Sequence, residues 1–522
     1  MQNRQMKRLM AGAWALSVAT LIAKVLSAVY RVPFQNMVGD TGFYVYQQVY
    51  PLYGIGMTFA LSGFPVFISK VVAEAAEPAE QAQVAHRLMV LLSWLAGATF
   101  IALELGAGLI ATWMGDGDLA DLIQTVAFMF LVMPLLATIR GYYQGTYDMT
   151  KTAVSQVVEQ VVRVAVILLA AWLAGRLGWS VYQMGAIAMS GAFFGGAAAL
   201  VVIVPAYWRV VATQRFTWPG WAAYRQLAGR LVREGGLIAM FAAMVVLLQL
   251  IDSFTVTKGL VAAGVDPAVA KALKGVYDRG QPLVQLGLVV ATALSTSLLP
   301  GLATAFVQRQ QAAFVGTAQR LVRFTQVMAV AATAGLIAIM PAVNWLLFGD
   351  TAGTLTLQVY VVAILLVALI NADAAILQSS NQFAKAGWAL AIGLVVKLVA
   401  TPPLVRLTGT MGAAAATVLA LGVIGLLTHL QLPAPITARR RDHFLAKLGL
   451  CTGVMVLVVA LTLAWWPLTS RLAALLQSGV GVLVGLVSFI GAASAVRLLS
   501  IREVLALPFG RRLLKALRRH RS

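Results

Sequence analysis

Nine charged residues lie inside long apolar stretches of this sequence. Charged side chains in such a setting are candidates to bind ions or anionic groups. They are Lys24, Glu104, Glu159, Arg163, Asp252, Asp278, Arg279, Asp373 and Lys397. Because a charge in an apolar medium is costly, such residues normally face a water-filled cavity or a charged partner. The acids are suited to exchange a proton or a cation, and the guanidinium and ammonium groups are suited to hold a phosphate.

Two of these sites have a specific chemical interpretation. The guanidinium of Arg279 can hold a phosphate through two parallel hydrogen bonds, and the adjacent Asp278 could hold or release it. The alternative for this pair is a local ion pair. Asp252 follows Gln249 on an otherwise apolar helix and is a candidate cation or proton site, with a salt bridge to a lysine elsewhere as the alternative.

The other intramembrane charges have simpler interpretations. Glu159 and Arg163 are four residues apart, so they share a helix face and can neutralise each other. Lys24 and Lys397 lie more than two turns from a helix end, which favours a cavity over an extended side chain that reaches the interface. No partner for Glu104 or Asp373 can be identified from the sequence.

Metal and thiol chemistry are disfavoured by the composition. Cys451 is the only cysteine, and the four histidines have no metal-ligand spacing. No loop holds an acid pair that could act as a general base and metal ligand. We therefore expect neither an enzyme nor a cofactor, and a gradient of Na+ or protons or the membrane potential remains as the energy source.

The elements that position these charges are transmembrane helices. The chain has 522 residues, of which 60% are hydrophobic and 11% charged, so it needs the bilayer as its solvent. Runs of roughly 20 apolar residues predict an all-α protein with about fourteen spans. The net charge of +21 predicts cytoplasmic loops near anionic lipids rather than nucleic-acid binding.

The distribution of lysine and arginine predicts that both termini are cytoplasmic. In this topology Arg140 flanks a cytoplasmic loop, whereas Arg31 and Lys274 flank outer loops. The predicted parts are an N-lobe (1–208, spans 1–6), a basic and aromatic cytoplasmic linker (209–231), a C-lobe (232–433, spans 7–12), two further spans (434–499) and a basic cytoplasmic tail (500–522).

The two predicted lobes resemble each other at a fixed offset of 234 residues. The matched pairs are Gln144 with Gln378, Lys151 with Lys385, and Arg163 with Lys397. A match of glutamine, lysine and a mid-helix cation without a gap is typical of a duplicated gene half. Duplicated halves around a central cavity are the usual architecture of secondary transporters.

Several short motifs resemble one branch of a transporter superfamily. They are Ala-Lys-Val-Leu-Ser-Ala-Val-Tyr-Arg-Val-Pro-Phe at 23–34, Gly-Phe-Pro-Val-Phe-Ile-Ser-Lys at 63–70, Arg-Gly-Tyr-Tyr-Gln-Gly at 140–145, Ser-Gln-Val-Val-Glu-Gln at 155–160, Val-Tyr-Asp-Arg at 276–279 and Ala-Ala-Ile-Leu-Gln at 374–378. The chain is similar over its whole length to the MurJ-type and stage V sporulation protein B-type branch of the multidrug/oligosaccharidyl-lipid/polysaccharide (MOP) exporter superfamily. This resemblance implies two six-helix lobes in a V, with the last two spans forming a groove for a lipid tail.

The resemblance also implies roles for individual residues. Arg279 matches a cavity arginine of the family, and Lys24 occupies a place where members have an arginine. Together with the buried charges considered above, we expect a substrate cavity for the diphosphate or head group from Lys24, Asp278, Arg279, Arg163 and Lys397. Asp252 matches an acid with which some members bind sodium, and Thr417 matches a hydroxyl of that site. Where the pattern has an asparagine and then an acid, this chain has Thr401 and Val405, so the sodium site is matched only in part and Thr401 is a weaker candidate for ion coupling.

The resulting prediction is a monomeric flippase for an undecaprenyl-diphosphate-linked sugar, foremost the peptidoglycan precursor lipid II, in the cytoplasmic membrane. Its role would then be in cell-wall biogenesis and cell shape. The alternatives are a flippase for another polysaccharide unit and a cation-coupled drug antiporter on the same fold. The cationic cavity candidates favour a polyanionic head group over a cationic drug. A membrane glycosyltransferase is disfavoured because no large extramembrane domain is present.

Overall fold

The computed structural model describes residues 2–211, 220–292, 298–380, 382–437 and 443–499. Within these ranges every regular element is a helix, which is one of the two backbone arrangements that satisfy all peptide groups inside a bilayer. In the described part of the chain, twelve helical segments are long and apolar enough to cross a membrane. One of them, Ala15–Glu74, has 60 residues, enough for two crossings. The predicted span 276–305 lies partly outside the described residues, and the prediction of an all-α protein with about fourteen spans is confirmed.

The first compact unit consists of Met1–Pro282 and Lys397–Ala413. Its helices are α1 (Gln2–Val29), α2 (Arg31–Thr58), the π-helix η1 (Phe59–Gly63), α3 (Phe64–Glu74), α4 (Pro78–Met114), the 3-10 helix η2 (Gly117–Leu119), α5 (Ala120–Gly145), α6 (Met149–Leu177), α7 (Val181–Val211), α8 (Trp221–Arg230), the π-helix η3 (Leu231–Gly235), α9 (Gly236–Ala242), α10 (Met244–Ala262) and α11 (Pro267–Asp278).

The second compact unit consists of Leu283–Val396 and Ala414–Ser522. Its helices are α13 (Leu299–Val307), α14 (Gln311–Phe348), α15 (Thr354–Tyr360), α16 (Val362–Ser379), α19 (Ala434–Thr437), α20 (Phe444–Leu463) and α21 (Arg471–Ala495). Three helices have residues in both units: α12 (Gly280–Thr292), α17 (Phe383–Thr408) and α18 (Thr410–Leu430). The N-lobe, linker and C-lobe boundaries remain predictions.

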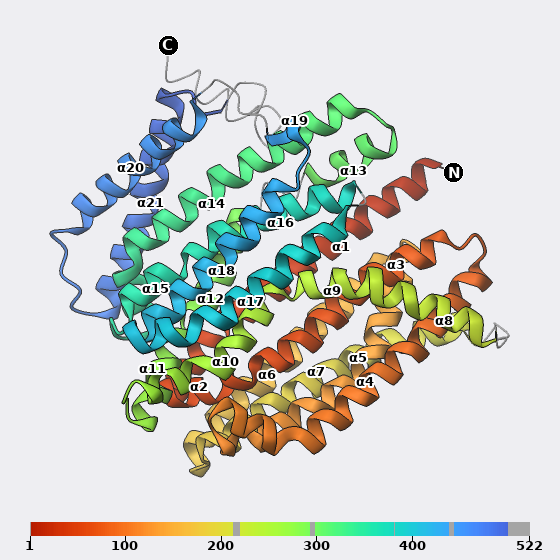
Figure 1. The fold of residues 1–522 in the computed structure, drawn as a ribbon, viewed down its shortest axis with the longest axis horizontal. Helices are drawn as coiled ribbons and strands as arrows, with labels where there is room; N and C mark the ends of the chain where they lie inside the picture. The colour runs from red at the N-terminus through yellow and green to blue at the C-terminus, as the bar shows by residue number, and fades with distance from the viewer. Residues whose placement is uncertain (1, 212–219, 293–297, 381, 438–442, 500–522) are drawn as a thin grey trace. The chain divides into compact units, whose positions relative to one another are not determined.

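Close helix packing in the first unit depends on small residues. Helices α4, α5, α6 and α7 run side by side (Figure 1). At Gly195 of α7 a Cβ atom would lie 2.7 Å from the backbone oxygen of Glu159 on α6. Only glycine therefore allows these two helices to approach, and their contact fixes the part of α6 that carries Arg163.

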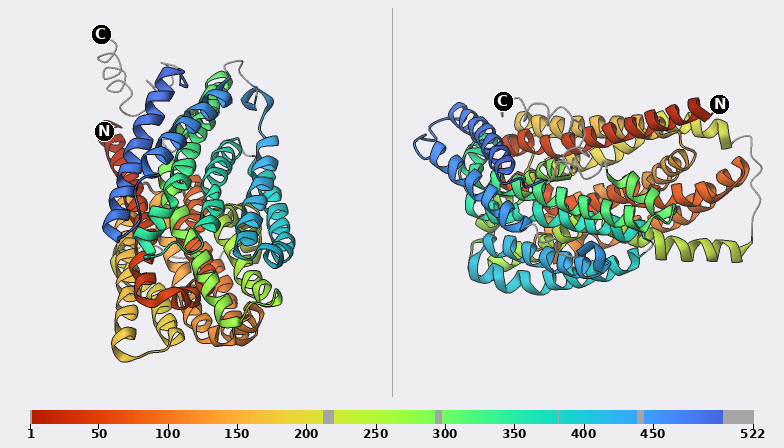
Figure 2. Two further views of the ribbon diagram at one scale, coloured as in Figure 1. Left: turned by 90° about the vertical axis from the view of Figure 1, so that its left-hand side faces the viewer. Right: turned by 90° about the horizontal axis from the view of Figure 1, so that it is seen from above.

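In the second unit α20 and α21 form a hairpin that packs along α14 (Figure 2). Their shared core contains Val327, Leu448, Cys451, Met455 and Phe489. Packing of apolar side chains from three long helices accounts for this contact. The predicted role of these last two helices as a groove for a lipid tail remains a proposal.

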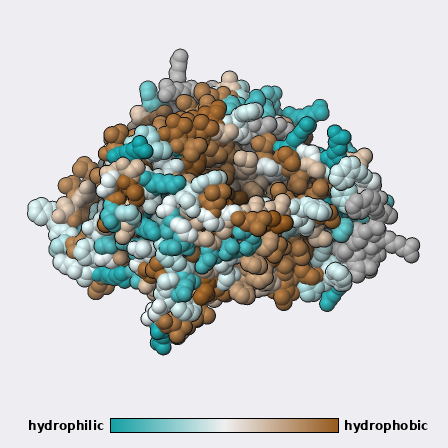
Figure 3. Space-filling model, turned by 60° about the horizontal axis from the view of Figure 1, so that its bottom comes forward, coloured by the Kyte–Doolittle hydropathy of each residue, from teal (hydrophilic) through white to brown (hydrophobic). Residues whose placement is uncertain are grey.

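The surface of the protein is unusually apolar. Hydrophobic residues cover broad areas of the face in Figure 3, between hydrophilic ones. Large exposed apolar side chains include Leu105 of α4, which is 84% exposed, and Trp388 of α17. A soluble protein would bury such patches, whereas lipid tails solvate them.

Candidate functional site

Four tyrosines in the first unit surround two buried arginines. Tyr46, Tyr50 and Tyr53 recur on α2 at spacings of four and three, which places them on one face of the helix. Tyr30 precedes α2, and its hydroxyl lies 2.9 Å from that of Tyr46. All four side chains are buried. We call Tyr30, Tyr46, Tyr50 and Tyr53 the tyrosine cage.

Arg31 and Arg163 both contact the tyrosine cage. The guanidinium carbon of Arg31 lies 4.2 Å from the ring centroid of Tyr50. That of Arg163 lies 5.1 Å from the centroid of Tyr53, and its Nη1 contacts the Tyr53 hydroxyl. The two arginines are 0% and 1% exposed, respectively. Within the described part of the chain, all three guanidinium nitrogens of Arg31, and Nε and Nη2 of Arg163, lack a hydrogen-bond partner.

These guanidinium groups make the cage a site that favours an anion. A buried charge without a counter-ion is strongly unfavourable. Attraction to the tyrosine rings recovers only about 0.5 to 2 kcal/mol for each cation. An anion with several acceptor oxygens would satisfy the remaining N–H groups of Arg31 and Arg163 together.

A separate buried ion pair lies one helical turn from Arg163. Arg140 at the end of α5 donates to Glu159 on α6 at 2.7 Å and to the Ser155 hydroxyl at 3.0 Å. Glu159 therefore has an ion-pair partner on the neighbouring helix, in addition to its helical spacing from Arg163. This arrangement leaves the charge of Arg163 available to the cage.

A second cluster of charges lies between α10, α11 and α17. Nζ of Lys397 lies 2.5 Å from Oδ1 of Asp252, and Tyr277 donates to Oδ2 of Asp252 at 2.8 Å. Lys274 donates to both carboxylate oxygens of Asp278, at 2.6 and 2.7 Å. All four charged side chains are buried. We call Asp252, Asp278, Lys274 and Lys397 the lysine–aspartate cluster.

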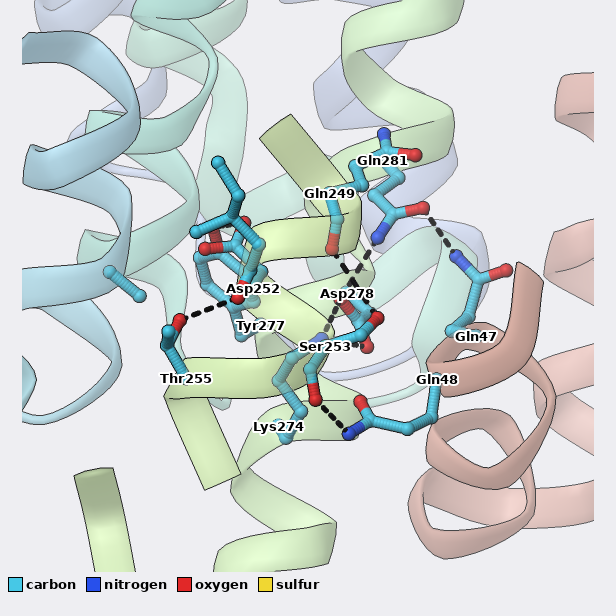
Figure 4. Close-up of polar contacts among 12 residues, drawn as sticks. Gln47, Gln48, Gln249, Asp252, Ser253, Thr255, Lys274, Tyr277, Asp278 and Gln281 are labelled. Atoms are coloured by element: carbon cyan, nitrogen blue, oxygen red, sulfur yellow. Dashed lines mark hydrogen bonds and ion pairs between the residues drawn. The ribbon is translucent and has the colours of Figure 1, made fainter. Parts of the chain in front are cut away.

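Three glutamines link this cluster to α2 (Figure 4). Gln281 donates to Asp278 at 2.9 Å, and the oxygen of Gln281 accepts from Gln47 at 2.7 Å. The neighbouring Gln48 donates to the backbone oxygen of Ser253 at 2.6 Å. Helices α2, α10 and α11 are thus joined by buried polar contacts, which fix the position of the charges.

Arg279 contacts α2. Its Nη2 donates to Asp40 at 2.6 Å, and Gln35 donates to the same oxygen at 2.8 Å. At Gly275 a Cβ atom would lie 2.1 Å from the backbone oxygen of Asp40, so α11 touches the α2 backbone there. Arg279 is buried at this contact, whereas Lys24 is exposed on α1.

A further ion pair ties α11 to two other elements. Lys271 lies 2.8 Å from Asp116, which precedes η2, and donates to the hydroxyl of Tyr182 on α7 at 2.8 Å. Burial lowers the pKa of Lys271, but the hydrogen bonds to Asp116 and Tyr182 outweigh it, so the pKa is raised above its ordinary value. Lys271 therefore stays charged, and the contact persists at physiological pH.

The remaining candidates lie elsewhere. Thr401 is buried on α17, and its hydroxyl donates to the backbone oxygen of Lys397 at 2.7 Å. Thr417 is buried on α18 in the second unit. In that unit His429 lies 3.0 Å from Asp373, which gives this acid the partner that the sequence did not identify. Glu104 is partly buried on α4.

Comparison with known proteins identifies the family and relatives of this chain. The family model described as "Polysaccharide biosynthesis protein" matches residues 9–306. The chain belongs to this family. It is 36% identical to the uncharacterized membrane protein YabM of Bacillus subtilis over 97% of this chain and 96% of the relative. It is 27% identical to the lipid II flippase MurJ of the same organism over 87% and 86% of the two chains.

Solved structures show the same fold. A lipid II flippase MurJ in an inward closed conformation has a TM-score of 0.72 at 14% identity, over 92% of this chain and 98% of that one. An inward-facing multidrug resistance MATE transporter of the MOP superfamily has a TM-score of 0.62 at 14% identity, over 82% and 100%. The predicted resemblance to the lipid II flippase-like branch of the MOP superfamily is confirmed.

Sequence reasoning missed three buried cations of this family member. Arg31, Arg140 and Lys274 were expected as charges flanking loops, but the structure buries all three side chains. Arg31 begins α2, and its position next to Tyr30 places it at the cage. The spacing of the tyrosines on α2 was a signal in the sequence, because it predicts one aromatic face beside Arg31.

Proposed function

We propose that this chain flips an undecaprenyl-diphosphate-linked sugar precursor, foremost lipid II, from the inner to the outer leaflet of the cytoplasmic membrane. Transport proceeds by alternating access without covalent chemistry. Membership in the polysaccharide biosynthesis protein family and 27% identity to a lipid II flippase support this assignment. Peptidoglycan synthesis is the pathway that would receive the product.

The pair of arginines in the tyrosine cage carries the proposal. A diphosphate has many acceptor oxygens, and guanidinium groups bind phosphate through parallel hydrogen bonds. Arg31 and Arg163 offer five nitrogens without partners in the described chain. Binding of the diphosphate would remove the cost of two uncompensated buried charges, so this site favours the anionic head group of the lipid.

Two further cations take part in the proposed cycle. Arg279 is held by Asp40, which is 28% exposed at its side chain, so a phosphate oxygen can compete for the same guanidinium. Lys24 is exposed on α1 and meets the head group before it reaches the cage. Exchange of Asp40 for phosphate at Arg279 would loosen the contact between α2 and α11 and so link substrate binding to movement.

The proposed topology has both termini in the cytoplasm and a monomeric protein. The basic linker and tail would then lie against anionic lipids of the inner leaflet. Because the substrate carries negative charge outward, the membrane potential, which is negative inside, favours its export. A proton gradient is the other energy source in this proposal.

A drug antiporter is the competing assignment, because MATE transporters share the fold. Buried guanidinium groups repel a cationic drug, so the tyrosine cage argues against it. The aromatic rings alone would attract a cation. The sign of the bound ligand therefore decides between the two functions.

Native mass spectrometry of the purified full-length protein tests this choice. Undecaprenyl diphosphate, undecaprenol and a lipophilic cation such as tetraphenylphosphonium are each offered separately. We expect saturable binding of the diphosphate, and binding at least about tenfold weaker for undecaprenol, because it has the same tail without the charge. Preferential binding of the cation would overturn the flippase assignment.

A further inference from the structure

The resemblance to the exporter branch implies a sodium site at Asp252, and the structure shows which group faces this carboxylate. The ammonium of Lys397 lies 2.5 Å from Oδ1 of Asp252. The other carboxylate oxygen accepts from Tyr277 at 2.8 Å. Both charged side chains are buried, at 1% and 0% exposure. A cation that belongs to the chain itself therefore already pairs with the carboxylate that a metal ion would need.

We propose that Lys397 is the resident cation of the Asp252 site, so that this protein takes up no Na+ there and its transport does not depend on a Na+ gradient. Hard cations bind where several oxygen atoms converge around one point. Besides Asp252, the ammonium of Lys397 lies 3.3 Å from the backbone oxygen of Ala413. Lys397 thus already uses oxygens that a Na+ ion would need.

The charge balance of the lysine–aspartate cluster leads to the same conclusion. Lys274 neutralises Asp278 at 2.6 Å, just as Lys397 neutralises Asp252. Two carboxylates and two ammonium groups give a neutral cluster. An added Na+ would bring a net positive charge into a buried region next to two ammonium groups, which is electrostatically unfavourable.

The predicted internal repeat has a cation at the equivalent position of both halves. Lys397 corresponds to Arg163 at the offset of 234 residues, so both halves carry a cation on the equivalent helix. The residue equivalent to Asp252 in the first half is Val18. In the second half, Asp252 is the counter-ion of Lys397. In the first half, Arg163 has no equivalent acid and, under the proposed function, binds the substrate anion. The ammonium of Lys397 is a fixed counter-ion of Asp252.

The test measures binding of radioactive 22Na+ to the purified full-length protein without any lipid substrate, so its outcome does not depend on the proposed flippase activity. We expect no saturable 22Na+ binding at Asp252 in the wild-type protein. The wild-type protein and Asp252→Asn should therefore bind the same amount of 22Na+. Saturable binding by the wild-type protein that Asp252→Asn abolishes would overturn the proposal. This arm needs no variant at position 397.

A second arm removes the resident cation. Lys397→Asn keeps a polar side chain and leaves Asp252 without its ammonium, so we expect saturable 22Na+ binding to appear in this variant and to vanish in Lys397→Asn/Asp252→Asn. Lys385→Asn is the matched control, because Lys385 is exposed on the same helix and contacts Gln382. It should behave as wild type. A monodisperse Lys397→Asn protein that binds no 22Na+ would also contradict the proposal.

Discussion

Gln47 donates a 2.7 Å hydrogen bond to Gln281, a residue that lies 234 positions further along the chain. The same offset relates Arg163 to Lys397 in the sequence repeat. Residues that are equivalent by a pseudo-twofold axis contact each other directly only where they lie near that axis. The contact between two glutamines at this offset therefore supports the duplication.

Arg31 of the tyrosine cage should be dispensable for folding. We expect Arg31→Met, which keeps length and loses charge, to leave the Tm in detergent unchanged or raised, because an uncompensated buried charge disappears. Binding of undecaprenyl diphosphate should weaken by about tenfold or more, since a charged hydrogen bond contributes roughly 1.5 to 3 kcal/mol. A lower Tm with unchanged binding would show that Arg31 has a structural role.

The paired arginine should behave in the opposite way. Arg140→Met leaves the buried carboxylate of Glu159 without its ion pair, so we expect a loss of about 3 to 5 kcal/mol in the free energy of unfolding. Arg140→Met/Glu159→Leu removes both charges and should recover most of that loss. Thermal unfolding of the single and double variants measures this. Equal destabilisation in both would show that the ion pair is not the cause.

The contact between α11 and α2 should tolerate no side chain at Gly275. In Gly275→Ala the new Cβ would meet the backbone of Asp40, and we expect a loss of about 1 to 3 kcal/mol in stability from overpacking. Gly97→Ala is the matched control, because a Cβ there has no neighbour within 4 Å. Melting curves of the two variants should therefore differ, and identical curves would refute this packing.

The proposed topology can be tested by cysteine labelling in a Cys451→Ala background. Asp118 lies in η2 and Glu80 in the first turn of α4, and both acids are exposed. We expect a membrane-impermeant maleimide added to intact cells to label Asp118→Cys and to leave Glu80→Cys unlabelled until the cells are opened. The reverse pattern would place both termini outside.

Much of the helical fold could be predicted from the sequence, because runs of apolar residues and their interruptions determine where helices cross a membrane. The partners of the buried charges could not be predicted from the sequence. The acid at 252 could be interpreted as an ion site or as half of a salt bridge, and only packing of α17 against α10 identifies Lys397 as the partner. Similarly, the spacing of Glu159 and Arg163 indicated a pair, but the neighbouring helix supplies Arg140.

The burial of Arg31 illustrates the same limit. An arginine between two apolar runs is normally a loop residue, and the distribution of lysine and arginine predicted that Arg31 flanks an outer loop. In the structure α1 ends at Val29 and α2 begins at Arg31, so the connection is too short to carry the side chain away from the helices. Whether such a side chain points inward depends on how the two helices cross, which no local pattern encodes.

The most direct test of the proposed function is the rate at which the full-length protein moves lipid II across the bilayer of sealed proteoliposomes. Fluorescent lipid II is placed in both leaflets, and an impermeant quencher reports the fraction that reaches the outside over time. We predict rapid, complete quenching with the wild-type protein, and a rate at least about tenfold lower with Arg31→Met reconstituted at the same level. If the folded wild-type protein gives the same quenching as protein-free vesicles, for lipid II and for other undecaprenyl-diphosphate-linked sugars, the account is wrong.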